Sequence, residues 1–169
     1  AGGAFIKQYQ QSGLADTMPL YTVFTVDSIS LPKLQSADME GILGTSMTQS
    51  WSPDLDTAAN KKLVNGFLEN YGRYPSFYAA QAYDTMNLIK SAIDKTGGVV
   101  DDVDALRAAI AAADFDSVRG DFSFGNNHFP IQNFYARKVV ADADGNWTTE
   151  ITDTVLPAHQ DPYAADCKL

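Results

Sequence analysis

Cysteine, histidine and basic residues are scarce in this sequence of 169 residues. The one cysteine, Cys167, excludes a disulfide within the chain and a zinc site built from several cysteines. The two histidines, His128 and His159, have no metal-ligating neighbours at helical or hairpin spacing, so the sequence predicts no metal site. Twelve Lys and Arg against 21 Asp and Glu leave a net charge of -9, which argues against nucleic acid or an anionic membrane surface as a partner.

Long apolar runs and catalytic motifs are also missing. The longest uninterrupted apolar run, 108–113, is far shorter than the ~20 residues that a membrane-spanning helix needs. Neither a Gly-x-Ser-x-Gly elbow nor a glycine-rich phosphate loop occurs, so the sequence predicts no catalytic residues, no cofactor and no enzyme activity. The acidic cluster 142–146 resembles a calcium loop, but Gly145 follows the second aspartate too early for the EF-hand register. A hairpin turn explains this cluster better.

The first third of the chain has the pattern of a helix followed by two short apolar strands. Residues 1–14 form a helical pattern that Gly13 ends. The β-branched and aromatic run 20–26 predicts a mostly buried strand, and 41–47 predicts a second one. Because short buried strands separated by helices favour parallel pairing, we expect an α/β fold with parallel sheets flanked by helices.

The middle third is predicted to be helical. Apolar residues repeat at helical spacing over 63–71, and Ser76 stands where it can cap a following helix over 77–93. Asp101 and Asp104 have the spacing of a capping box, which predicts the start of a further helix.

The last third changes to the alternating pattern of β-strands. Residues 121–124 alternate between aromatic and polar side chains. The segments 133–140 and 147–155 are rich in strand-forming residues and flank the Asp-Gly turn at 142–146. The sequence therefore predicts a C-terminal β-hairpin.

Aromatic residues are plentiful, with nine phenylalanines and eight tyrosines. Most of them are expected in the core. Tyr78, however, lies in the first turn after the Pro75-Ser76 helix start, and residues at the end of an element often face a cleft. Tyr78 is therefore a candidate ligand contact.

Five segments of the chain follow one another in an order that resembles a known family of receptors. These segments are 5–14, 38–42, 71–84, 118–124 and 128–132. Together they resemble the second half of the leucine/isoleucine/valine-binding-protein-like periplasmic receptors, which are the type I solute-binding components of ABC transporters.

The resemblance implies a two-lobed α/β receptor that is incomplete here. Residues 1–48 would belong to the C-terminal lobe, 49–131 to the N-terminal lobe, and 132–169 would return to the C-terminal lobe, while the first half of the receptor would be absent. Such a receptor is periplasmic, encloses a small molecule by closing its lobes, and delivers it to a membrane permease. Loss of the first half would explain why Cys167 has no partner, and it predicts that residues 1–169 self-associate when alone.

The resemblance also implies which residues face the ligand. Members that bind amino acids place a carboxylate for the ligand's ammonium group at a position that falls here on Phe24 or Thr25, with Asp27 as a substitute. A second position, an aromatic residue at a helix start, falls on Tyr78. Because Phe24 cannot form an ion pair with an ammonium group, a carboxylate or an amide is expected ahead of a branched-chain or aromatic amino acid.

Two other functions stay open at this point. The same fold could serve a ligand-sensing receptor that regulates a partner protein, because a fold does not determine its function. A small hydrolase is a distant alternative, since the sequence offers neither a spaced nucleophile and base nor a metal centre.

Overall fold

The computed structural model describes residues 2–168 and shows an α/β fold built on one five-stranded sheet. The strands are β1 (Tyr21–Val23), β2 (Ser46–Gln49), β3 (Phe122–Phe124), β4 (Pro130–Ala141) and β5 (Trp147–His159). The α-helices are α1 (Gly2–Gln11), α2 (Leu31–Gln35), α3 (Ala58–Tyr71), α4 (Phe77–Lys95) and α5 (Val103–Ala111). Short 3-10 helices occupy Leu14–Asp16, Glu40–Ile42 and Ala164–Asp166. The predicted α/β class is confirmed.

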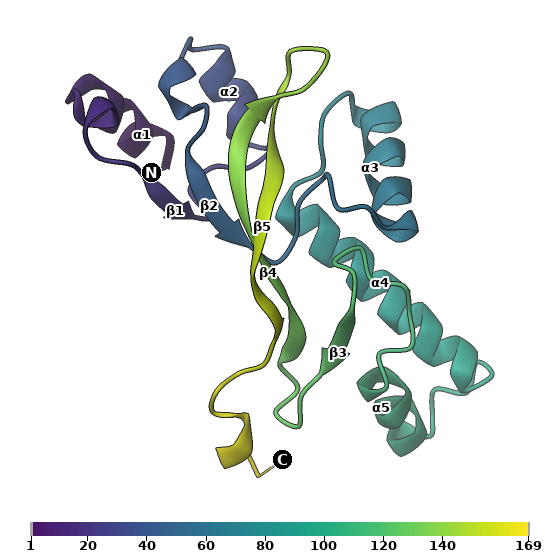
Figure 1. The fold of residues 1–169 in the computed structure, drawn as a ribbon. Coiled ribbons are helices and arrows are strands. Elements are labelled where there is room, and N and C mark those ends of the chain that lie inside the picture. Colours follow the sequence, from purple (N-terminus) through teal and green to yellow (C-terminus); the bar gives the residue numbers. More distant parts are fainter. Residues whose placement is uncertain (1, 169) are drawn as a thin grey trace.

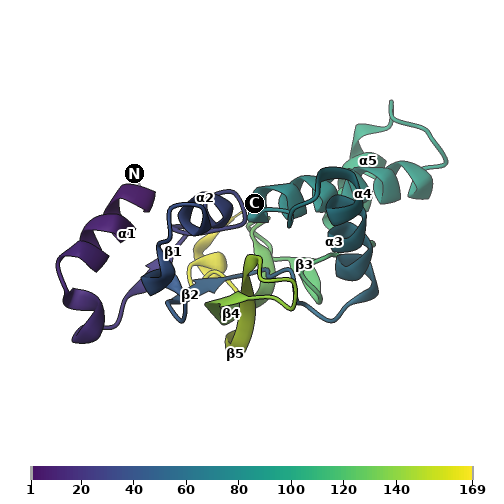
Figure 2. The same ribbon diagram turned by 90° about the horizontal axis from the view of Figure 1, so that it is seen from above.

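Strand β4 connects two groups of elements. One of its edges pairs with β2 along residues 135–138 and with β3 along residues 130–132, and the opposite edge pairs with β5. Figures 1 and 2 show α1, α2, β1 and β2 on one side of the β4–β5 hairpin, and α3, α4 and α5 on the other. The pair β1–β2 is parallel as predicted, whereas every pair that includes β4 is antiparallel.

The apolar core is divided in the same way into two clusters. The first core cluster consists of Ile6, Val26, Leu31, Leu34, Ile42, Met47, Val139 and Trp147. The second core cluster consists of Trp51, Leu63, Val64, Ala80 and Val118. The first cluster takes residues from α1, α2 and the tip of the β4–β5 hairpin, and the second takes residues from α3 and α4.

The predicted helices are present, and their caps explain where they begin. The Ser76 side chain accepts a hydrogen bond from the Ala79 amide, which confirms the predicted cap of α4. The prediction for α5 was wrong by one residue, because Asp102 rather than Asp101 accepts from the Ala105 amide. Helix α3 starts earlier than its apolar stripe indicated, since the Thr57 side chain caps it by accepting from the Asn60 amide.

The two early strands are shorter or later than predicted. Strand β1 ends at Val23, because Phe24 adopts a left-handed backbone conformation with φ of 58° that strand pairing cannot continue. The segment 41–47 was predicted as a strand, but the chain first forms a 3-10 turn and then turns at Gly44 with φ of 80°, so that pairing starts only at Ser46.

The predicted C-terminal hairpin is confirmed and is longer than expected. Its turn is held by Asp142, whose Oδ1 accepts hydrogen bonds from the amides of Asp144 at 2.9 Å and Asn146 at 2.8 Å. These contacts give Asp142 a structural role in the hairpin turn. Register shifts interrupt the β4–β5 ladder between Gln132 and Arg137, and such irregularities increase the local twist and redirect side chains.

Candidate ligand-binding site

A pocket lies where the ends of β1 and β2 and the start of α4 meet the β4–β5 hairpin. Its wall includes Val26 and Leu31 of the first core cluster and Trp51 of the second. Other wall residues with aromatic or polar side chains are Phe24, Asp27, Ser28, Gln49, Phe77, Tyr78, Arg137, Thr148 and Thr149. The pocket therefore receives side chains from both groups of elements.

Aromatic rings form one side of this pocket. The ring centroids of Phe24 and Phe77 lie 5.5 Å apart at an interplanar angle of 62°, and those of Phe77 and Tyr78 lie 5.8 Å apart at 65°. Phe24 is 58% exposed and Tyr78 is 59% exposed. Two aromatic side chains thus keep free surface beside the pocket, where they can pack against an apolar or planar molecule.

Local structure explains how these rings reach the pocket. Phe24 follows the last residue of β1, and its left-handed backbone turns the chain out of the strand direction. Tyr78 is the second residue of α4, which starts there because Pro75 and the Ser76 cap set its first turn. The Ser28 hydroxyl donates a hydrogen bond to the Pro75 carbonyl and ties the segment after β1 to the start of α4.

The structure brings three of the four predicted site residues together. Phe24, Asp27 and Tyr78 line the pocket, whereas Thr25 is not part of its wall, and the Thr25 hydroxyl donates instead to the Val23 carbonyl at 3.3 Å. The Asp27 carboxylate is partly used by its own turn. Its Oδ1 accepts from the amides of Ile29 and Ser30, each at 3.0 Å.

Arg137 is a wall residue that the sequence analysis missed. It lies on β4 and is only 5% exposed. Its Nη1 donates to Thr149 Oγ1 at 3.3 Å, while its Nε has no hydrogen-bond partner among the described residues. Burial lowers the pKa of Arg137 to about 10, and the opposing charges of Asp54 and Asp27 limit this decrease, so the guanidinium stays positive at neutral pH.

A signal for Arg137 was present in the sequence. Tyr135, Arg137 and Val139 alternate along β4 and are all buried, so they occupy the same face of the strand. An arginine between two residues of a buried face is unusual, because charged side chains are rarely buried without a partner.

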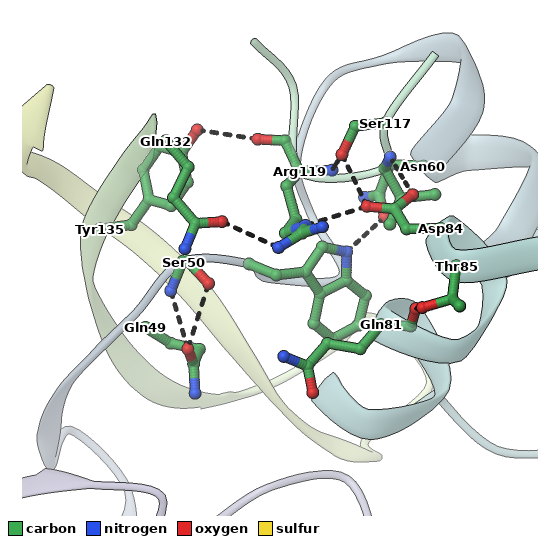
Figure 3. A network of polar contacts seen from close by, with 12 residues as sticks. Gln49, Ser50, Asn60, Gln81, Asp84, Thr85, Ser117, Arg119, Gln132 and Tyr135 are labelled. Carbon is green, nitrogen blue, oxygen red and sulfur yellow. Dashed lines mark hydrogen bonds and ion pairs between the residues drawn. The ribbon is translucent and has the colours of Figure 1, made fainter. Parts of the chain in front are cut away.

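A second buried arginine supports the site without lining it. Arg119 donates from Nε to Asp84 Oδ2 at 2.9 Å, and the same oxygen accepts from the Ser117 hydroxyl at 2.6 Å. The Arg119 Nη1 donates to Gln132 Oε1 at 3.0 Å. Figure 3 shows this network between α4, the segment before β3, and β4. The charge of Arg119 is thus paired with that of Asp84, whereas Arg137 forms no ion pair with any residue that the structure describes.

Residues 2–168 contain no group of three or more His, Cys, Asp or Glu that could hold a metal ion. In the same part of the chain, no helix has the length and apolar character to cross a membrane. Cys167 is half-buried and unpaired.

Comparison with known proteins gives a consistent result. A family described as periplasmic binding protein matches residues 1–146. A search among curated proteins finds no match. A solute-binding protein of an ABC transporter from R. palustris, solved in complex with benzoate, is 31% identical, with a TM-score of 0.83 over 99% of this chain and 43% of that chain.

Two further solved structures extend the comparison. A solute-binding protein from Rhodopseudomonas palustris BisB5, in complex with 3,4-dihydroxybenzoic acid, is 29% identical, with a TM-score of 0.81 over 95% of this chain and 43% of that one. A leucine-binding protein from Thermotoga maritima shares the fold at 20% identity, with a TM-score of 0.69 over 91% of this chain and 42% of that one. The chain thus spans less than half the length of each of these structures.

Proposed function

The chain belongs to the periplasmic binding protein family, and we propose that it is part of an extracytoplasmic receptor that binds a small solute and delivers it to the permease of an ABC transporter. Its solved relatives are transport-associated binding proteins. A receptor of this kind binds its solute by closing two lobes around it, so that ligand binding and conformational change are coupled.

The division of the core supports a two-lobed arrangement. The second core cluster lies entirely between residues 49 and 131, which we assign to one lobe. The first core cluster combines residues 1–48 with the tip of the hairpin in 132–169, which we assign to the other lobe. In this proposal the chain crosses between the lobes after β2 and again along β4.

The observation that carries the proposal is the position of the pocket. Phe24 from one proposed lobe and Phe77 from the other make an aromatic contact at its edge. A solute in this pocket contacts both lobes at once, and contact with both is what allows a ligand to stabilise a closed form.

The aromatic wall also supports a ligand class. The two relatives from Rhodopseudomonas palustris bind benzoate and 3,4-dihydroxybenzoic acid. Phe24, Phe77 and Tyr78 offer ring faces and edges that suit a planar aromatic body. We therefore assign an aromatic monocarboxylate to this receptor, in preference to a free amino acid.

Substitution of Tyr78 tests this function. In the complete receptor, Tyr78→Ala is expected to weaken benzoate binding about tenfold, because one aromatic contact is lost. Isothermal titration calorimetry measures the affinity. Tyr163→Ala is the matched control, since Tyr163 is 73% exposed and lies outside the pocket wall. Equal affinity of Tyr78→Ala and the wild type would remove Tyr78 from the site.

Delivery to a permease needs a separate experiment. Cells that contain the receptor and its transporter are expected to accumulate labelled benzoate, and deletion of either component should abolish the uptake. Uptake that persists without the receptor, together with benzoate binding by the pure protein, would favour a sensing role.

A further inference from the structure

Arg137 differs from the other buried charges of the described chain. It is 5% exposed, yet it forms no ion pair within residues 2–168. Arg119, which is buried to a similar degree, is paired with Asp84 at 2.9 Å. A buried charge without a partner is costly, so its position calls for a partner outside residues 2–168, and the pocket that Arg137 lines is where a solute can supply one.

Arg137 lines the pocket and has a hydrogen-bond donor without a partner among the described residues. Its Nε–H is buried without an acceptor, and Thr148, which also lines the pocket, has a buried hydroxyl oxygen without a partner. Thr149 accepts from Nη1 and holds the guanidinium in place. Gln49 lies in the same wall, and its Oε1 is already occupied by the Ser50 amide at 2.9 Å. The pocket wall therefore combines two residues that have unpartnered polar atoms, Arg137 and Thr148, with the aromatic rings of Phe24, Phe77 and Tyr78.

The acidic residues near Arg137 are too distant or already engaged to neutralise it by contact. Asp27 uses Oδ1 for the turn that starts α2, and Asp54 Oδ2 accepts from the Ile151 amide at 2.8 Å. Both carboxylates act on Arg137 only through longer-range charge. Their charges raise the pKa of Arg137, but neither carboxylate forms an ion pair with the guanidinium.

We propose that Arg137 binds the carboxylate of the solute, with the Thr148 hydroxyl as a second donor, while Phe24, Phe77 and Tyr78 cover the apolar body of the solute. This inference rests on the proposed function and adds to it the group that selects an acid. A guanidinium matches a carboxylate in geometry and charge, and the interaction is strong because Arg137 is only 5% exposed. A neutral amide of the same shape leaves the charge of Arg137 unpaired and is therefore rejected.

Benzoate and benzamide distinguish this role, because they have nearly the same shape and differ in charge. The complete wild-type receptor is expected to bind benzoate at least about 100-fold more tightly than benzamide, as measured by calorimetry. Arg137→Gln is expected to lose this preference mainly through weaker benzoate binding, and Arg137→Lys to retain part of it. Lys138→Gln is the matched control. It removes one positive charge from the same strand, but its side chain lies near Glu150 at 3.8 Å and outside the pocket wall.

A stability measurement separates ligand binding from a structural role. Arg137→Met is expected to unfold at the same or a higher temperature than the wild type when both are free of ligand, because a buried, unpaired charge is replaced by an apolar side chain. Added benzoate is expected to raise the unfolding temperature of the wild type but not that of Arg137→Met. A variant that is clearly less stable without ligand would assign Arg137 a structural role and overturn the proposal.

The remaining outcomes separate this inference from the function on which it rests. Two results would contradict the role of Arg137 but leave solute binding intact. One is a wild-type receptor that binds benzamide as tightly as benzoate. The other is a folded Arg137→Gln variant whose affinity for benzoate lies within threefold of the wild-type affinity. Wild-type receptor that binds neither benzoate, benzamide nor leucine contradicts both proposals.

Discussion

At the scale of single residues, the site combines a strained backbone at Phe24 with Arg137, a buried charge that forms no ion pair within the described part of the chain. Phe24 has φ of 58°, a left-handed conformation that costs a bulky residue about 1–2 kcal/mol. The ring gains little burial in exchange, since it is 58% exposed. The left-handed backbone directs the ring toward Phe77 and the pocket, and strained residues of this kind cluster at ligand-binding sites.

Glycine and leucine at position 24 separate strain from ring contact. Phe24→Gly relieves the left-handed strain, whereas Phe24→Leu keeps it, and both remove the ring. We expect Phe24→Gly to have a free energy of unfolding about 1 kcal/mol higher than that of Phe24→Leu. Both variants are expected to bind benzoate more weakly than the wild type. Urea denaturation and calorimetry check these results, and undiminished affinity in both would exclude a contact between Phe24 and the solute.

At the scale of elements, buried polar contacts position the helix that carries Tyr78. Asp84 on α4 is 1% exposed and accepts from Ser117, Val118 and Arg119. Because Arg119 also donates to Gln132, this network links α4 to β4. It fixes α4 relative to the strand that carries Arg137, so the aromatic and charged parts of the pocket depend on one support.

Two aspartates of α4 provide a matched comparison. Asp84→Ala leaves the buried Arg119 without its carboxylate and is expected to lower the free energy of unfolding by about 3–5 kcal/mol. Asp94→Ala removes an exposed ion pair with Lys90 on the same helix. It is expected to lower the free energy of unfolding by at most about 0.5 kcal/mol. Urea denaturation measures both values. Similar losses in the two variants would show that the buried network contributes no more than a surface pair.

At the scale of the whole molecule, polar contacts join the segment that leads into α4 both to the hairpin turn and to the segment after β1. Tyr74, just before α4, donates to Asp142 Oδ2 in the hairpin turn at 2.9 Å. Burial raises the pKa of Tyr74 to about 12, and the hydrogen bond to Asp142 adds to the increase. Burial tends to raise the pKa of Asp142 as well, but hydrogen bonds from Asn146, Tyr74 and Asp144 outweigh it and lower this pKa below 3.8.

The lowered pKa of Asp142 gives the contact a defined pH dependence. A carboxyl group whose pKa is lower in the folded state contributes stability above its unfolded value of 3.8 and loses it as the pH falls through the folded value. The wild type should therefore lose this contribution below about pH 3.8. The Tyr74→Phe variant lacks the hydrogen bond from Tyr74 to Asp142. Its free energy of unfolding is therefore expected to fall less on acidification than that of the wild type. Urea midpoints measured between neutral and acidic pH test this, with Tyr163→Phe as control, and identical pH profiles would contradict it.

The sequence by itself determined the features that depend on neighbouring residues. The cap of α4 at Ser76 and the turn at Asp142 were predictable, because the atoms that form each contact lie within a few residues of one another. The resemblance to the receptor family pointed to Phe24 and Tyr78, and the structure places both in one pocket.

Only the tertiary structure decided the lengths of the strands, the pairing of β4 with both β2 and β3, and the burial of Arg137 without an ion pair among the described residues. The sequence shows that Arg137 follows an alternating pattern, but its lack of an acidic partner within residues 2–168 depends on every residue that the fold places around it. Some of these neighbours, such as Asp27 and Asp54, are more than 80 positions away in the chain. Burial and charge pairing are properties of such distant contacts, and local patterns of sequence do not encode them.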